Sequence, residues 1–125
     1  MNPSAELADL GQRNISATVM TLTSPWMRYF LFYDPVPALR KVSCPVLAVD
    51  GSLDLQVPAD TNLHGIERAL RAGGNKDVTI RNFPGLNHLF QTAKTGAPGE
   101  YSTIEETIAP EVLKEIGDWV SAHAK

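Results

Sequence analysis

The sequence predicts an α/β fold in which two parallel strands have helices beside them, and three observations support this prediction. Residues 46–49 and 78–83 are short apolar runs of strand length that contain several β-branched side chains. A helical pattern lies between them, over residues 59–71, and another follows from Pro110 onward. The order strand, helix, strand, helix is typical of a parallel sheet, because each crossover returns the chain to the same end of the sheet.

The N-terminal part of the chain is predicted to be helical. Residues 4–22 carry apolar side chains three or four positions apart, but a glycine and an asparagine weaken the middle, so two pieces or a kink are expected. Ser24 followed by Pro25 is a favourable helix start, and we predict a second helix over residues 25–33. This helix is apolar nearly all round, which predicts that other protein covers it.

The two predicted strands differ in their patterns. Residues 46–49 are apolar on both faces, which favours a central strand with a neighbour on each side, although this chain supplies only one. Residues 78–83 show enough alternation of apolar and polar side chains to be expected nearer the edge of the sheet.

The segments around the strands are less regular. Prolines 35 and 37 end helix 25–33, with one more turn expected over residues 38–42. Residues 91–102 contain glycine and proline and are predicted to form a surface loop.

The two helices beside the sheet each show an apolar stripe. The stripe of helix 59–71 consists of Leu63, Ile66, Ala69 and Leu70. A Gly-Gly-Asn sequence at 73–75 ends this helix. The stripe of the last helix consists of Val112, Leu113, Ile116, Trp119 and Val120. Both stripes are therefore expected to pack against the sheet.

Composition narrows the classes of function. The chain has 125 residues, 43% hydrophobic and 20% charged, as in ordinary soluble domains. A formal net charge of −3 argues against nucleic-acid binding. No apolar run approaches the roughly 20 residues that span a membrane, and the first residues lack the basic and apolar segments of a signal peptide. Localisation stays open, with a cytoplasmic location as the default. The single cysteine, Cys44, is expected to be a small buried residue.

Two polar residues follow the predicted strands in glycine-containing loops. Asp54 follows the first strand and His88 the second, so both are expected at the carboxyl end of the sheet, where catalytic groups of α/β folds gather. A carboxylate that orients an imidazole forms the acid and base of a nucleophilic relay. Asp50 is the alternative acid, with a structural role favoured for it. His64 is expected on a helix surface and His123 in a fraying C-terminus.

Simpler explanations exist for other polar and aromatic residues. The histidines do not have metal-ligand spacings, so neither a metal nor another cofactor is expected. The aromatic residues of helix 25–33 could line a substrate pocket, but helix packing is the favoured explanation. An acidic side near the last helix, expected to be a solvated face, consists of Glu100, Glu105, Glu106 and Glu111.

The segment from Ser24 to Trp119 resembles the C-terminal part of an α/β-hydrolase. The resemblance is carried by Cys-Pro-Val-Leu-Ala-Val-Asp-Gly-Ser-Leu-Asp-Leu-Gln-Val-Pro at 44–58 and Gly-Leu-Asn-His-Leu-Phe-Gln at 85–91. It looks closest to the bacterial esterase-like branch grouped with dienelactone hydrolases and prolyl-oligopeptidase-type domains. There, a segment like residues 24–35 ends a helical cap. The resemblance implies a partial hydrolase fold, a cap-derived segment over 1–35, and hydrolase-domain sequence over 36–125. It also implies that Asp54 is the acid and His88 the histidine of a catalytic triad for ester hydrolysis.

The chain departs from this family in one essential respect. The family places its nucleophile in Gly-x-Ser-x-Gly upstream of the acid, and no serine of this chain has glycines at both positions. The chain therefore resembles about the last third of an enzyme, and we expect it to be inactive alone. An ester substrate is expected only for the complete enzyme. The alternative function is a non-catalytic interaction module. A homo-oligomer is expected in either case, through the unpaired strand edge and helix 25–33.

Overall fold

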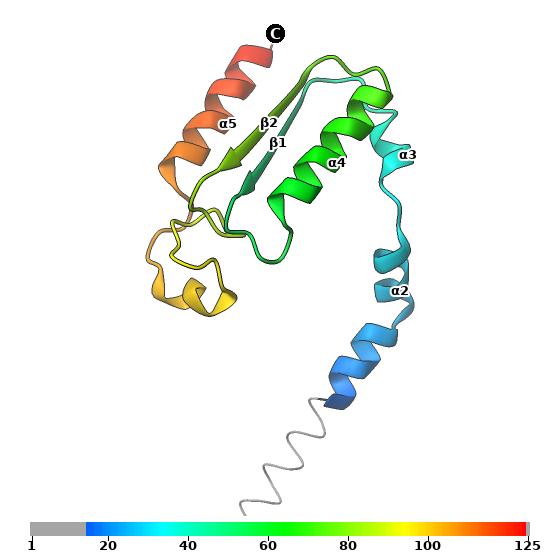
Figure 1. Ribbon diagram of the computed structural model, residues 1–125, viewed down its shortest axis with the longest axis vertical. Coiled ribbons are helices and arrows are strands. Elements are labelled where there is room, and N and C mark those ends of the chain that lie inside the picture. The colour runs from blue at the N-terminus through cyan, green and yellow to red at the C-terminus, as the bar shows by residue number, and fades with distance from the viewer. Residues whose placement is uncertain (1–14, 125) are drawn as a thin grey trace, which may run out of the picture. The chain divides into compact units, whose positions relative to one another are not determined.

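The computed structural model describes residues 15–124, which form two compact units, one ending at Pro35 and the other beginning at Val36 (Figure 1). In the first unit, residues 15–23 are helical and α2 spans Pro25–Phe32. Ser24 caps α2 as predicted, because its Oγ accepts the N–H of Met27 at 3.2 Å. The predicted helical residues before position 15 lie outside the described residues. No residue of α2 is buried.

The second unit contains the sheet and its helices. Its elements are α3 (Val36–Leu39), β1 (Val46–Gly51), α4 (Ala59–Ala72), β2 (Val78–Phe83), the 3₁₀ helix η1 (Pro98–Thr103) and α5 (Pro110–His123). The helical turn predicted over 38–42 begins earlier, at Val36, because Pro37 lies in the first turn, where it needs no N–H partner. The loop predicted over 91–102 overlaps η1. The glycines and prolines of this stretch indicated a loop, so this short helix was not predicted.

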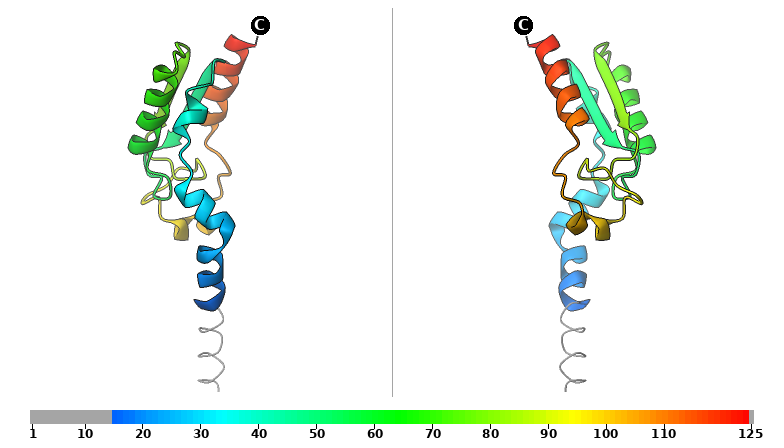
Figure 2. Two further views of the ribbon diagram at one scale, coloured as in Figure 1. Left: turned by 90° about the vertical axis from the view of Figure 1, so that its right-hand side faces the viewer. Right: turned by 90° about the vertical axis from the view of Figure 1, so that its left-hand side faces the viewer.

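β1 and β2 pair in parallel, so the predicted α/β class is confirmed at this level. The register sets Val46 beside Val78 and Gly51 beside Phe83, so the two strands begin and end at the same heights. Figure 2 shows α4 and α5 on opposite faces of this two-stranded sheet. In the part of the chain that the structure describes, β1 pairs only with β2.

The two helices cover the sheet unequally. α4 buries Ala59, Leu63, Ala69 and Leu70, whereas Ile66 is half-buried. α5 buries only Val112, although its Trp119 Nε1 donates a hydrogen bond to Thr79 Oγ1 on β2 at 3.0 Å. The predicted stripe of α5 is therefore wrong in part, because Leu113 is exposed, and Ile116 and Val120 remain exposed beside β1. The latter two line an open groove of about 390 Å³, the β1–α5 groove, whose other walls are Pro45, Val46, Leu47, Val49 and Trp119.

Cys44 is exposed, and its predicted burial is wrong. Only Pro45 separates it from the start of β1, and Pro45 is exposed as well. Its carbonyl accepts a hydrogen bond from Asn75 Nδ2 at 2.8 Å, which ties the chain before β1 to the end of α4. A cysteine ahead of a strand is buried only when another element covers that corner of the sheet.

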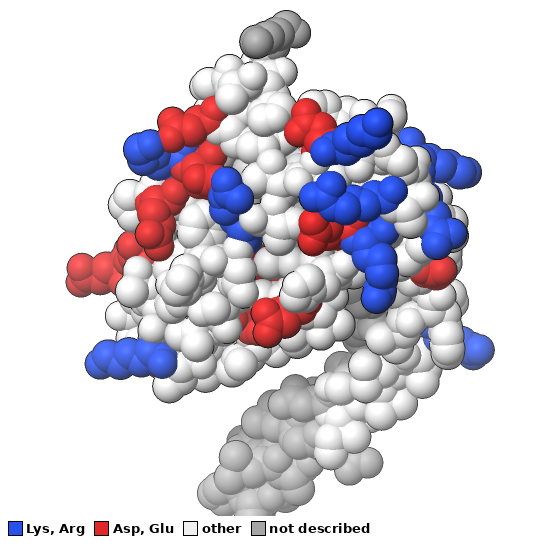
Figure 3. Space-filling model, turned by 45° about the horizontal axis from the view of Figure 1, so that its top comes forward, with Lys and Arg blue, Asp and Glu red and all other residues white. Residues whose placement is uncertain are grey.

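None of the helices in the described residues has the length and apolar character needed to cross a membrane. On the face drawn in Figure 3, basic side chains lie mostly on the right and acidic ones mostly toward the left, with some of the opposite sign in each region. The presence of both signs in each region is what an ordinary solvated surface shows.

Candidate active site

Two loops meet at the carboxyl end of the sheet. Because Gly51 and Phe83 are register partners, the loops that follow them start at the same height. Leu53 N–H donates to the Leu86 carbonyl at 2.9 Å, Ser52 N–H donates to the Phe83 carbonyl at 2.9 Å, and Gly85 N–H donates to Ser52 Oγ at 2.8 Å. These hydrogen bonds join the loop after β1 to the loop after β2.

Gly51 allows this close approach. A Cβ at this position would lie 2.3 Å from the Leu86 carbonyl oxygen and 2.8 Å from the Asn87 carbonyl oxygen. Both contacts are to backbone, which cannot move aside without breaking the hydrogen bonds between the loops. Glycine is therefore required where the first strand ends. Because it has no side chain, the second loop can contact the first.

Asp54 is held in one orientation by the loop that contains it. Its Oδ1 accepts the backbone N–H groups of Gln56 and Val57, both at 2.8 Å. The side chain is 3% exposed. Burial by itself raises the pKa of Asp54, but the hydrogen bonds from Val57, His88 and Gln56 outweigh it and hold the pKa below its ordinary value. Asp54 is therefore an ionised acceptor at neutral pH.

His88 is placed by a second set of hydrogen bonds, centred on a buried asparagine. Asn87 is fully buried, its Oδ1 accepts the N–H groups of Leu89 and Gln91, and its Nδ2 donates to Gln91 Oε1. Phe90 adopts a φ of 57°, an uncommon conformation for a non-glycine residue, and this turns the chain sharply after His88. The loop tip is therefore fixed on both sides of the histidine.

Gln91 extends this network to the segment before α5. Its Nε2 donates to the Glu106 carbonyl at 2.9 Å, and the Glu106 carboxylate accepts the N–H of Thr92 at 2.6 Å. Glu100 accepts the N–H groups of Thr95 and Gly96. Neither Glu100 nor Glu106 is buried, in keeping with the predicted solvated face, but both also hold loop backbone in place.

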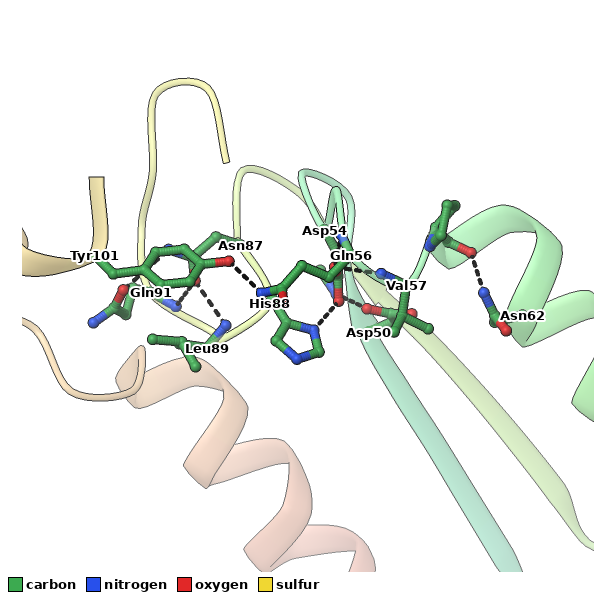
Figure 4. A network of polar contacts seen from close by, with 12 residues as sticks. Asp50, Asp54, Gln56, Val57, Asn62, Asn87, His88, Leu89, Gln91 and Tyr101 are labelled. Atoms are coloured by element: carbon green, nitrogen blue, oxygen red, sulfur yellow. Dashed lines mark hydrogen bonds and ion pairs between the residues drawn. The ribbon is translucent and has the colours of Figure 1, made fainter. Parts of the chain in front are cut away.

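Asp54 and His88 meet as the sequence predicts. Asp54 Oδ2 lies 2.7 Å from His88 Nδ1 (Figure 4). Because the carboxylate can only accept, Nδ1 carries the proton and donates. The His88 side chain is 37% exposed, in contrast to its buried partner. The pair lines a cavity of about 190 Å³ with Val49, Asp50, Val57 and Phe90. This arrangement fixes the imidazole tautomer and leaves Nε2 as the basic nitrogen.

Asp50, the alternative acid, lies beside Asp54, but the His88 ring is hydrogen-bonded to Asp54, so the structure pairs His88 with Asp54 rather than with Asp50. Asp50 is 8% exposed and its Oδ1 accepts the N–H of Gly51 at 2.8 Å. Burial raises the pKa of Asp50, and the neighbouring Asp54 carboxylate adds to this rise against the opposing effect of the Gly51 N–H.

The other histidines lie away from this site. His64 is exposed on α4, as predicted, and its Nδ1 lies 2.7 Å from the Asp60 carbonyl oxygen. His123 stacks on Trp119 at 4.1 Å and its Nε2 lies 3.4 Å from Asp77 Oδ1, so it ends α5 in an ordered contact rather than in a frayed turn. Over residues 15–124, no group of three or more His, Cys, Asp or Glu residues is arranged to hold a metal ion.

No serine hydroxyl of the described residues forms a hydrogen bond with His88. Ser52 is the serine nearest along the chain to Asp54, and its Oγ accepts the N–H of Gly85 in the joint between the loops. The site therefore consists of an acid and a base, without a nucleophile among residues 15–124.

Comparison of the chain with protein-family models, with curated proteins and with solved structures finds no significant match. The resemblance to α/β-hydrolases therefore stays a prediction, and the case for a function depends on the geometry of the Asp54–His88 pair.

Proposed function

We propose that the chain carries the acid–base part of a serine-dependent ester hydrolase of the α/β-hydrolase type. The observation that supports it best is the 2.7 Å hydrogen bond between Asp54 Oδ2 and His88 Nδ1, with the other carboxylate oxygen held by two backbone N–H groups. A carboxylate fixed in this way serves to orient an imidazole and to stabilise it once it is protonated.

In the proposed reaction, His88 Nε2 takes the proton of a serine hydroxyl as the serine oxygen attacks the ester carbonyl carbon. Asp54 stabilises the resulting imidazolium. The tetrahedral intermediate collapses, the ester C–O bond breaks, and His88 returns the proton to the leaving alcohol. Water then attacks the acyl-serine by the same route, releasing the carboxylic acid. The serine and the oxyanion donors come from sequence outside these 125 residues.

The proposal predicts that the 125-residue chain is inactive by itself. The chain has neither a serine nucleophile beside Nε2 nor donors for the oxyanion, and these two groups usually contribute most to such catalysis. We expect no labelling by a fluorophosphonate probe and no turnover of a chromogenic short-chain ester above buffer. Labelling of any serine of this chain, or turnover that disappears in His88→Ala, would contradict this prediction.

The positive test uses a polypeptide that joins the chain to the coding sequence upstream of Met1. We expect that sequence to continue in frame into a Gly-x-Ser-x-Gly segment. In the extended protein, the probe should label this serine, and His88→Ala should abolish the labelling. An extended protein that hydrolyses esters equally well with and without His88 would refute the proposed role.

A second candidate function, association with other protein, is favoured by the apolar surface of the second unit. Val120 is 50% exposed and Ile116 is 37% exposed, and both line the β1–α5 groove next to a strand whose second edge has no partner in residues 15–124. Apolar patches and strand edges of this kind are usually covered. We propose that the chain forms a homo-oligomer through this edge and through the apolar α2, whether or not it takes part in catalysis.

A further inference from the structure

A second carboxyl group lies against the proposed catalytic pair. Asp50 is the residue before the last in β1, and its carboxyl group points toward that of Asp54 (Figure 4). It is 8% exposed and lines the same cavity as Asp54 and His88. Two buried carboxyl groups in contact do not both ionise at low cost, because their like charges repel in a poorly solvated site.

The surroundings decide which of the two carboxyl groups carries the charge. Asp54 accepts three N–H donors, from Gln56, Val57 and His88, whereas Asp50 accepts one, from Gly51. The group with more donors is the better anion. The pKa of Asp54 is accordingly lowered and that of Asp50 raised. When the pair shares one proton, Asp50 is therefore the favoured holder of it and Asp54 the favoured anion.

The hydrogen bonds to Asp54 also leave room for one more donor. An ionised carboxylate has about four lone-pair positions, and three are taken by Gln56 N–H, Val57 N–H and His88 Nδ1–H. Every buried side-chain oxygen and nitrogen among residues 15–124 has a hydrogen-bond partner. Asp50, whose carboxyl group points toward that of Asp54, is placed to supply the fourth donor when it holds a proton.

We propose that Asp50 is a positioning residue that donates a hydrogen bond from its protonated carboxyl group to the Asp54 carboxylate and thereby fixes that carboxylate against His88. This inference rests on the proposed acid–base function of Asp54 and His88, and it extends that function to a buried group of three. Asp54 and His88 are the titratable groups that act on Asp50 among the described residues. Ionisation of Asp50 removes the donor and adds a negative charge beside the pair.

The test uses nuclear magnetic resonance on the 125-residue chain with labelled histidine. Two signals are followed: the His88 Nδ1 proton, and the His88 ring shifts as a function of pH. Asp50→Asn keeps a donor for Asp54 and an acceptor for Gly51 N–H but cannot ionise. Asp50→Ala removes both. Asp118→Asn on the surface of α5 is the matched control, since it makes the same substitution in a side chain that is 66% exposed.

We expect the wild type to show a step in the His88 ring shifts as Asp50 ionises, and both Asp50 variants to lose this step. Exchange of the Nδ1 proton with water should be about tenfold faster in Asp50→Ala, the factor expected for loss of one hydrogen bond, and close to wild type in Asp50→Asn. Asp118→Asn should change neither signal. Rescue by asparagine distinguishes donation to Asp54 from a role in packing alone.

Three outcomes would overturn the inference. One is an unchanged ring-shift titration in both Asp50 variants, another is equally fast exchange in both, and the third is unchanged exchange in Asp50→Ala. Asp54→Asn separates the inference from the proposal on which it rests. If Asp54→Asn removes the Nδ1 proton signal while the Asp50 variants have no effect, only the role of Asp50 fails. If Asp54→Asn leaves the signal unchanged, the pairing of Asp54 with His88 fails as well.

Discussion

The carboxyl end of the sheet and the β1–α5 groove differ in how fully their polar and apolar groups are paired or covered within the chain. At the carboxyl end, two loops are joined by hydrogen bonds, and the buried residues Asp50, Asp54 and Asn87 are all bonded to neighbouring groups. In the groove, Ile116 and Val120 face open space beside a strand with a single described neighbour. The site thus has its own local support, while the layers around it lack a cover.

This difference indicates which features of the chain depend on nearby residues and which depend on other protein. The geometry of Asp54 and His88 depends on residues close to them in sequence or one crossover away. Burial of the apolar face of α5 depends on protein that residues 15–124 do not provide. An acid–base pair can therefore be preformed in a chain whose hydrophobic surface still requires a partner.

The largest effect is expected from a substitution that separates the two hydrogen-bonded loops at the carboxyl end of the sheet. In Gly51→Ala the new Cβ meets the backbone of Leu86 and Asn87, and we expect the free energy of unfolding to fall by about 3 kcal/mol, the upper part of the range for overpacking. Urea denaturation followed by circular dichroism measures this change.

Gly65→Ala on α4 is the control for that substitution. A Cβ at Gly65 meets nothing within 4 Å, so alanine there should raise the stability by about 0.5–1 kcal/mol through helix propensity. Equal effects of the two substitutions would show that the loops do not need the close approach at Gly51.

A smaller effect is expected when the charge of the acid is removed. Asp54→Asn weakens its charge-assisted hydrogen bonds, and we expect a loss of about 2 kcal/mol of unfolding free energy at neutral pH. The pKa of Asp54 is lower in the folded chain than the ordinary value of 3.8, so its stabilisation is fully present above that pH. It is lost as the pH falls through the folded pKa. The measurement is denaturation of both proteins from pH 7 downward.

The pH dependence is the critical part of this experiment. The stability difference between wild type and Asp54→Asn should shrink as the solution becomes more acidic than pH 3.8. A difference that stays constant, or grows, with falling pH would mean that the carboxylate is not stabilised in the folded chain.

The smallest effect concerns the uncovered groove. Val120→Lys places a charge on an exposed apolar position, so monomer stability should change by less than about 0.5 kcal/mol. Self-association should weaken by at least about tenfold in dissociation constant, as measured by sedimentation velocity over a range of concentrations. Lys114→Ala on the solvent side of α5 should leave association unchanged. A wild-type chain that is monomeric at micromolar concentration would argue against the proposed association.

Much of the site was accessible from the sequence because its parts follow local patterns. An apolar run, a glycine loop and a polar residue after each strand were sufficient to predict that Asp54 and His88 meet. The roles of Gln91 and Glu106 were not accessible, because their hydrogen bonds join segments without a shared periodic pattern. For Asn87, only its position beside the predicted histidine indicated a role in the site.

The sequence by itself determined where several elements begin, as at Pro25 after its Ser24 cap and at Pro110, and which two residues end up at the same edge of the sheet. Caps, periodicity and turn residues act over a few positions, so a linear pattern contains them. Only the tertiary structure decided that His88 pairs with Asp54 rather than Asp50, that Gly51 must lack a side chain, and that α5 leaves its apolar face open. Those outcomes depend on strand register and on contacts across the crossover, which no local pattern records.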